Sequence, residues 1–478
     1  MGPTKSKKPN RRITALRSAS GSTPEQSFDW PLANAAEALL RRQLELFLSR
    51  NSLAQRLADR MLAETGTDFF EWIDHLTMPS DQEPALRETG FVPEKDVETP
   101  PGQTAYHHPR ATLPRVLVGG DSPVLALRPE YLADFIAQHN LQGEPEGAPY
   151  SRFRRGLVSE ENGTRLEAVE RNAYRGFVSV PLHPGELESI IKTRELLETR
   201  PRLFPEDAEG FKVAHALLER VLRLVDRDLA CKLFFEAERK YWQSRNYAAR
   251  TQKLRQDRLG LGWGNHDHHT FRCSRQHFVD VIEFLLKLGF QKRERYYAGS
   301  EAGWGAQILE QPLAGIVVFA DVDLMPQETQ LDFSSTRLSP APRLGTVGLW
   351  VGLHGESFLE AGMHHLEARF DFSQLQEQLK DCGIHTMKPF SDFDFLRQAF
   401  TEGERWPVRR QCAERLLSLG LITAEQFEKF LSQGAIGSHL ENLQRHGGFK
   451  GFNQKSVSVI ISATDPRKQH FPPAPVAA

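Results

Sequence analysis

The sequence has few cysteines, no long apolar run and almost no net charge. Of its 478 residues only four are cysteines, and none of them forms a CxxC pair. This argues against a disulfide framework or a zinc knuckle, so we expect free thiols in a reducing cytoplasm. No apolar run is long enough to cross a bilayer. The basic, polar residues 1–17 also lack the apolar stretch of a signal peptide.

The charge balance points to no macromolecular partner. Lys and Arg number 60 and Asp and Glu number 62, which gives a formal net charge of −2. We therefore expect neither nucleic acid nor an acidic membrane as the main partner. The chain is long enough for two or three domains. Histidine is the residue that stands out, with 17 copies that cluster at 107–108, 264–277 and 354–365.

Four segments differ in composition. Residues 1–30 are polar and basic and are predicted to form a disordered tail, and the proline-rich residues 469–478 form another. Residues 31–255 are predicted to be mostly helical, and residues 256–468 to form a β core that binds a metal. The role of 31–255 stays open between covering a site and self-association, so a homo-oligomer is one expectation.

The helical interpretation of the N-terminal region depends on two stretches of periodic apolar residues, 32–63 and 208–245. Between them, residues 80–128 contain Pro, Gly and short apolar runs, which predict a few strands and long loops. Residues 140–180 are charged and are predicted to be irregular.

The first module of the β core begins with an alternating strand at 266–273. Ser274 is placed to cap a helix over 275–288, and Gly289 is placed to end it. Three strands are predicted next, and they lie at 290–298, 304–310 and 314–322. The predicted order of elements is β-α-β-β-β.

The second module repeats this start with a strand at 364–370, a helix at 374–381 and a strand at 384–389. A helical insertion over about 392–446 is predicted to interrupt it; its helices are expected at 393–401, 408–419, 423–433 and 437–446. The module then resumes as a strand at 456–463. The predicted fold class is α+β, with paired β-α-β-β-β modules and a mostly helical N-terminal region.

Strand parity selects the chemistry-bearing side chains. On a strand, residues two apart share a face, so His268, Thr270 and Arg272 point one way. The second module places His365, Glu367 and Arg369 likewise. The opposite faces are mainly apolar and consist of His269, Phe271, Leu366, Ala368 and Phe370. If the two strands pair, two imidazoles meet at one point and two guanidiniums lie further along.

Two histidines need a carboxylate to complete a catalytic metal site. We expect Glu310 to be this third ligand, and Glu367, Asp321 and Gln307 are its rivals. Two imidazoles and one carboxylate on one face of the metal are typical of non-haem Fe(II) oxygenases. The remaining positions suit a 2-oxo acid and O2, and Arg369 or Arg272 suits the carboxylate of the acid. Three neighbours are expected to orient the ligands: His269, His364 and Glu367.

These motifs resemble the 2-oxoadipate dioxygenase/decarboxylase (hydroxyglutarate synthase) family of the vicinal-oxygen-chelate superfold. Residues 267–272 resemble the second metal strand of that family, and residues 308–311 resemble the segment that supplies its glutamate. Residues 365–369 resemble its first metal strand, with Arg369 in the place of the substrate arginine. The likeness covers roughly 260–465, and the two metal strands occur in swapped order.

The resemblance implies an Fe(II)-dependent enzyme that converts a 2-oxo acid and O2 into a hydroxy acid and CO2. The iron would be held by His268, His365 and Glu310. Two alternatives stay open. One is a lyase or isomerase of the same superfold that uses Mn, Zn or Ni. The other is a binding protein without activity, in which His268 and His365 would not converge.

Overall fold

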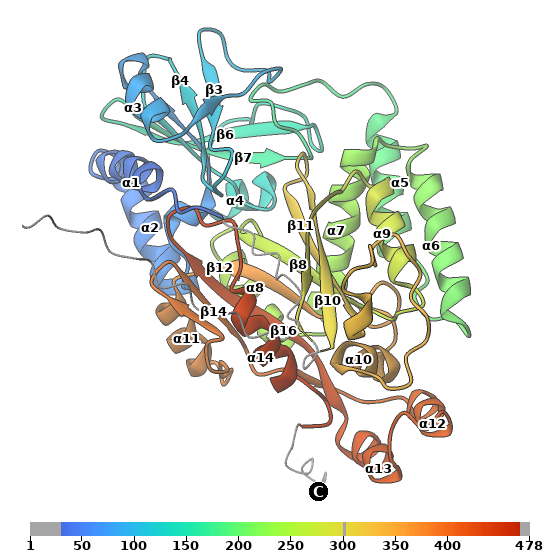
Figure 1. Ribbon diagram of the computed structural model, residues 1–478. Coiled ribbons are helices and arrows are strands. Elements are labelled where there is room, and N and C mark those ends of the chain that lie inside the picture. The colour runs from blue at the N-terminus through green and yellow to red at the C-terminus, as the bar shows by residue number, and fades with distance from the viewer. Residues whose placement is uncertain (1–29, 300–302, 469–478) are drawn as a thin grey trace, which may run out of the picture.

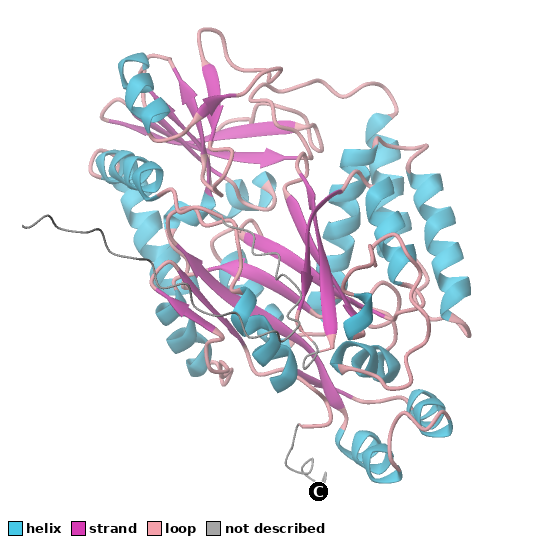
Figure 2. Cartoon of the chain, viewed as in Figure 1, coloured by secondary structure: helices cyan, strands magenta, loops and turns pink. Residues whose placement is uncertain are grey.

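The computed structural model describes residues 30–299 and 303–468. The predicted tails at 1–30 and 469–478 therefore fall outside it, apart from Trp30. Figures 1 and 2 show two β-sheets, an upper one built from the N-terminal part of the chain and a lower one from the C-terminal part, with helices around them. In the part of the chain that the structure describes, no helix is both long and apolar enough to cross a membrane.

The first half of the C-terminal sheet is the predicted β-α-β-β-β module. Its elements are β8 (His266–Cys273), α9 (Phe278–Lys287), β9 (Gln291–Tyr297), β10 (Trp304–Gln311) and β11 (Ile316–Asp323). The strands lie in the order β8-β11-β10-β9, and β8 is parallel to β11. A crossover through α9 is what allows the parallel pair.

The second half of the same sheet has the same arrangement of strands, counted outward from the middle of the sheet. Its elements are β12 (His365–Arg369), α11 (Phe372–Asp381), β13 (Ser391–Phe393), β14 (Leu396–Phe400) and β16 (Ala435–Arg445). The strands run β12-β16-β14-β13, with β12 parallel to β16. The two halves join through the antiparallel pair β8 and β12. The predicted pair of β-α-β-β-β modules is confirmed.

Several predictions for the second module were wrong. Residues 393–401 and 437–446 form strands β14 and β16, whereas the predicted strand at 456–463 is helix α14 (Gln454–Ala463). The helical insertion shrinks to α12 (Arg410–Ser418) and α13 (Ala424–Gln433), which follow the short strand β15 (Glu404–Trp406). A strand is recognised in a sequence by alternating apolar and polar residues. Strand β16 is buried on both faces, so its residues do not alternate in this way.

The N-terminal region contains a second sheet, more extensive than the few strands expected. Helices α1 (Asn34–Leu48) and α2 (Ser52–Thr65) precede it. Its strands are β1 (Ile73–Met78), β2 (Val92–Pro93), β3 (Thr104–His107), β4 (Arg115–Val118), β5 (Val124–Leu127), β6 (Phe153–Glu161) and β7 (Thr164–Arg171). The prediction that residues 140–180 are irregular was therefore wrong, because β6 and β7 pair there as a long hairpin.

The topology of this sheet resembles that of the C-terminal sheet. Its order is β2-β3-β4-β1-β5-β7-β6, with β1 parallel to β4 and β5 parallel to β7. Short helices make the crossovers: α3 (Glu83–Glu88) and α4 (Leu132–Gln138). The two halves again meet at an antiparallel pair, β1 and β5. The chain thus holds two sheets, each built from two modules placed side by side.

Helices cover the face of the C-terminal sheet opposite His268. They are α5 (Glu186–Glu198), α6 (Asp207–Val221), α7 (Arg227–Ser244) and α8 (Tyr247–Asp257). Helix α10 (Thr346–His354) packs on the other face, where Val347 shares a cluster with Val317 and Phe319. Phe234 and Phe235 of α7 share one buried cluster with Phe271, Leu366 and other residues of β8 and β12. The sequence grouped α5–α8 with the N-terminal region, but their apolar faces pack in the core of the C-terminal sheet. The parity prediction for this apolar face is confirmed.

Phe271→Ala tests how much this buried layer contributes to stability. Phe271 is fully buried, so the substitution leaves a cavity and is expected to lower the free energy of unfolding by about 3–5 kcal/mol. Leu254→Ala is the control, since Leu254 is 57% exposed and its loss is expected to change stability by less than about 0.5 kcal/mol. Urea unfolding followed by circular dichroism measures both. Equal effects of the two substitutions would contradict this packing.

Candidate metal centre

The pairing of β8 with β12 brings the two predicted histidines together. His365 lies opposite Thr270 in the register, so His268 and His365 are diagonal neighbours on one face. Their Nε2 atoms are 3.3 Å apart, and both side chains are buried. Neither histidine points toward the helical layer.

A carboxylate that the sequence analysis did not select completes the group. Glu441 lies on β16, in register with Glu367 of β12. Its Oε2 atom is 3.0 Å from Nε2 of His365 and 3.8 Å from Nε2 of His268. In the described part of the chain, these three residues form a group whose ligand atoms all lie within 4.8 Å of one another.

The structure does not bring Glu310 to this point. Glu310 lies on β10, and β11 separates β10 from β8. Two strand spacings amount to roughly 10 Å, which is too far for a shared ligand sphere at that level of the sheet. Lys450 instead holds the Glu310 carboxylate, with Nζ 3.1 and 3.0 Å from its two oxygens.

The three rivals of Glu310 have other partners. Glu367 accepts a hydrogen bond from Nδ1 of His268, at 2.6 Å. Asp321 lies opposite Arg272 on the neighbouring strand, and burial raises its pKa to about 7. Gln307 donates from its amide to the carbonyl oxygens of Glu294 and Ile308.

Glu441 was missed because residues 437–446 were interpreted as a helix. One signal for the end of the preceding helix was present in the sequence, namely Gly434, because glycine is common at helix C-termini. In the structure it has a φ of 70°, which favours glycine, and it ends α13 directly before β16. A second module also requires a strand parallel to its first one, as β11 is to β8. Within such a strand, Glu441 is the acidic residue.

Polar neighbours fix the orientation of the ligands. Because Nδ1 of His268 donates to Glu367, its Nε2 atom is directed toward His365 and Glu441, where a metal ion would take the place of the Nε2 proton. Gln398 of β14 donates to Glu367 at 2.7 Å and to Glu441 at 3.3 Å. Nδ1 of His364 is 2.9 Å from Nδ1 of His365. Thr270 places its hydroxyl 2.9 Å from Nε2 of His365.

The electrostatics of the group favour a bound cation. Burial raises the pKa of Glu441 well above its usual range, and the nearby carboxylate of Glu367 adds to this. Burial alone would lower the pKa of His268, but Glu367 and Asp267 outweigh it and raise the pKa to about 10. Burial and the charge of His268 lower the pKa of His365. Two imidazoles and a crowded carboxylate fit a divalent metal with a 2-His-1-carboxylate site.

The residues predicted to orient the ligands or to bind the substrate, other than those already described, do not lie together. His269 lies on the opposite face, where its ring is 4.8 Å from Phe235. Arg272 is fully buried and donates from Nη2 to the hydroxyl of Thr464 at 3.2 Å. Among the described residues, its Nε and Nη1 atoms have no partner. Arg369 is paired with Glu71, with Nη1 3.3 Å from Oε2.

A pocket of about 190 Å³ opens beside His268 and Glu367. Val317 and Phe319 of β11 form part of its wall, and Thr112 of the N-terminal region also lines it. The glycine-rich segment after β16 contributes Lys450, Gly451 and Phe452. Thr112 thus brings the N-terminal region to this pocket, and the role of residues 31–255 stays a prediction.

Comparison with known proteins adds only weak likenesses. No family model matches the chain, and no curated protein matches it. Among solved structures, a variant of 4-hydroxymandelate synthase from Streptomyces coelicolor is similar with 14% identity and a TM-score of 0.29, over 84% of this chain and 99% of that one. Methylmalonyl-CoA epimerase from Mycobacterium tuberculosis follows with 12% identity and a TM-score of 0.22, over 38% of this chain and 88% of that one.

A fusion protein of a xylose isomerase-like TIM barrel and 4-hydroxyphenylpyruvate dioxygenase is also similar. It has 11% identity and a TM-score of 0.25, over 84% of this chain and 53% of that one. Scores this low say nothing about activity, so the chemistry of the site has to be argued from its own residues.

Metal titration distinguishes Glu441 from Glu310. We expect Glu441→Ala to weaken the binding of a divalent metal at least 100-fold, about 2.7 kcal/mol, because it removes the charged ligand. Glu310→Ala is expected to change affinity less than threefold, since Lys450 holds that carboxylate. Anaerobic calorimetry with Fe(II), and with Mn(II) as the air-stable substitute, measures both. Loss of binding in Glu310→Ala alone would restore Glu310 as the ligand.

Proposed function

We propose that this protein is a non-haem Fe(II)-dependent dioxygenase and decarboxylase that acts on a 2-oxo acid similar to 2-oxoadipate. The products are a hydroxy acid with one carbon fewer and CO2. The observation that carries the proposal is the convergence of Nε2 of His268, Nε2 of His365 and the Glu441 carboxylate in a buried group. Such a triad leaves one face of the metal free for substrate and O2.

When bound, Fe(II) supplies the capacity to chelate the 2-oxo acid and to activate O2. The chain supplies orientation. Glu367 holds the proton of His268 on Nδ1, which directs Nε2 toward the metal, and Gln398 ties Glu367 to Glu441. The rings of Phe319 and Phe400 lie 4.4 Å from His268 and 4.9 Å from His365, and they keep water away from the imidazoles.

Arg272 is the candidate we select for a carboxylate of the substrate; it is fully buried and lies outside the set of residues that line the pocket beside His268. It lies on the same strand face as His268, four residues further along β8. Burial lowers its pKa to about 10, so the cation is in an unfavourable environment. A substrate carboxylate would accept from the Nε and Nη1 atoms that have no partner among the described residues. Arg369, the other candidate, is already paired with Glu71.

Two alternatives differ in what they require. A lyase or isomerase of the same superfold would use Zn, Mn or Ni in the same triad as a Lewis acid and would consume no O2. A binding protein without activity would not need His268 and His365 to converge, yet their Nε2 atoms are 3.3 Å apart. This distance disfavours the second alternative. The location in the cytoplasm stays a prediction.

Oxygen consumption tests the reaction. The anaerobically purified protein, loaded with Fe(II), is expected to consume O2 only when a 2-oxo acid such as 2-oxoadipate is added, and to release one CO2 per O2. His268→Ala is expected to lower the rate at least 1,000-fold, because the iron loses a ligand. An oxygen electrode combined with CO2 detection measures both. Turnover of a 2-oxo acid without O2 uptake would favour the lyase or isomerase.

Arg272→Gln tests the carboxylate partner. The substitution is expected to raise KM for the 2-oxo acid at least tenfold, about 1.4 kcal/mol, while Fe(II) affinity changes less than threefold. Arg272→Lys should recover part of the loss, since it keeps the charge but not the fork geometry. Steady-state kinetics at saturating iron measure this. An unchanged KM in Arg272→Gln would assign the carboxylate to another residue.

A further inference from the structure

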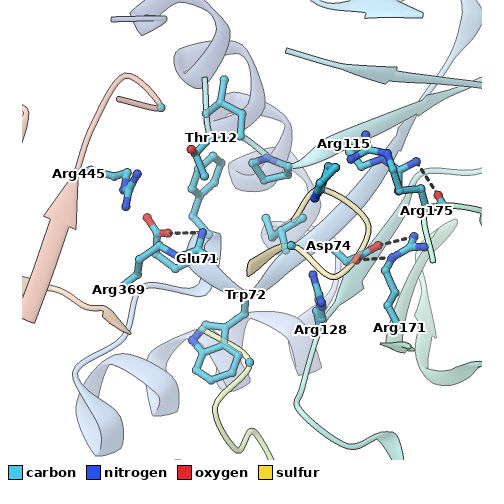
Figure 3. A pocket seen from close by; sticks show the side chains of 18 of the residues that line it. Glu71, Trp72, Asp74, Thr112, Arg115, Arg128, Arg171, Arg175, Arg369 and Arg445 are labelled. Carbon is cyan, nitrogen blue, oxygen red and sulfur yellow. Dashed lines mark hydrogen bonds and ion pairs between the residues drawn. The ribbon is translucent and has the colours of Figure 1, made fainter. Parts of the chain in front are cut away.

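A second cleft, rich in arginine, lies between the two sheets. Its volume is about 220 Å³. Figure 3 shows guanidinium groups on both sides of it, with Arg369 and Arg445 on one side and residues of the N-terminal sheet on the other. The complete set of lining arginines is Arg115, Arg128, Arg171, Arg175, Arg369 and Arg445. None of the chemistry proposed for the metal centre uses this cleft.

On the N-terminal side, three of these arginines share two carboxylates. Arg115 and Arg175 both bind Glu94, at 2.8 and 2.6 Å, so one carboxylate neutralises two cations. Arg171 forms a bidentate pair with Asp74, at 2.6 and 2.8 Å.

On the C-terminal side, each arginine has one acidic partner. Arg369 pairs with Glu71 at 3.3 Å, and Arg445 pairs with Asp267. In both arginines the Nε atom is buried and has no hydrogen-bond partner among the described residues. Each guanidinium therefore has donor capacity left.

Arg128 forms no ion pair with a carboxylate among the described residues, and Asp74 is the nearest acidic influence on it. In the described chain, neither a hydrogen bond nor an ion pair reaches its guanidinium, which lies between the two sides of the cleft in Figure 3. Burial lowers its pKa; the carboxylate of Asp74 opposes this shift, and the nearby Arg171 and Arg369 add to it. The six arginines that line the cleft are thus paired with only four carboxylates among the described residues, which leaves an excess of positive charge. Glu37, which also lines the cleft, is bound by Arg41 at 2.7 Å.

This excess of positive charge in a confined space has a physical cost, because the guanidiniums are partly desolvated and repel one another. A bound anion would offset that cost. Guanidinium forks match the oxygen spacing of carboxylate and phosphate groups, and such charge-assisted bonds are about twice as strong as neutral ones. We propose that the arginine cleft binds a small, multiply charged oxyanion, either a polycarboxylic acid or a phosphate compound.

The cleft is continuous with the metal pocket. Thr112, Gly315, Arg369 and Arg445 line both spaces. The anion would therefore bind next to the metal centre, close to the access route of the substrate. Binding itself depends only on the arginines, so the inference holds whichever metal the neighbouring site takes and whether or not it takes one.

Calorimetric titration of the metal-free full chain tests this site, with inorganic phosphate and succinate as probes at constant, low ionic strength. Saturable binding of at least one probe is expected, and the tighter of the two names the phosphate or the carboxylate class. Arg128→Gln is expected to weaken binding at least tenfold. This residue is the best choice because its loss leaves no buried carboxylate without a partner.

Two further variants give the test its controls. Arg223→Gln removes the same charge from an exposed position on the surface and is expected to leave affinity within twofold. Glu441→Gln alters the metal centre at a residue that lines neither pocket and is expected to leave anion binding within twofold. Absence of saturable binding, equal losses in Arg128→Gln and Arg223→Gln, or loss of binding in Glu441→Gln would each overturn the proposal. The last outcome would move the anion to the metal pocket without affecting the test of oxygen consumption.

Discussion

The antiparallel pairing of β8 with β12 is the constraint on which the site depends. It joins the two modules of the C-terminal sheet and sets His365 opposite Thr270. In a strand pair, a shift of one residue turns every side chain to the other face. Such a shift would bury His268 among the phenylalanines of the helical layer and turn Phe271 to the face that carries the metal centre. The apolar layer under α7 therefore fixes the register, and through it the distance between the two imidazoles.

The same pairing explains which parts of the site the sequence predicted. Strand parity needs only the local sequence, so it identified His268 and His365, the apolar residues behind them and Glu367 as a neighbour. The third carboxylate depends on the order of strands in the sheet. Glu441 is adjacent because β16 pairs with β12, whereas Glu310 is two strands from β8. The local sequence carries no information about the order of strands in a sheet. In addition, a strand buried on both faces, such as β16, lacks the alternation of apolar and polar residues by which strands are recognised.

The N-terminal sheet was underestimated for a related reason. Its strands β3, β4 and β5 have four residues each, too few for a clear period, and β6 carries charged residues that suggest a loop. The sheet becomes recognisable only through pairing, where β1 and β5 repeat the arrangement of β8 and β12. The two sheets lie next to each other, and the ion pair between Glu71 and Arg369 joins the N-terminal region to the C-terminal sheet.

The net charge of −2 conceals how the charges are distributed. Carboxylates gather around the imidazoles, and guanidiniums gather in the adjoining cleft. Asp267 lies where the two groups meet: it is 3.8 Å from Nδ1 of His268 and is bound by Arg445. Because buried charges interact strongly when little water separates them, the cleft and the metal centre share one electrostatic environment. In a chain whose overall charge is close to zero, this local segregation places a group suited to a cation beside a cleft suited to a small anion.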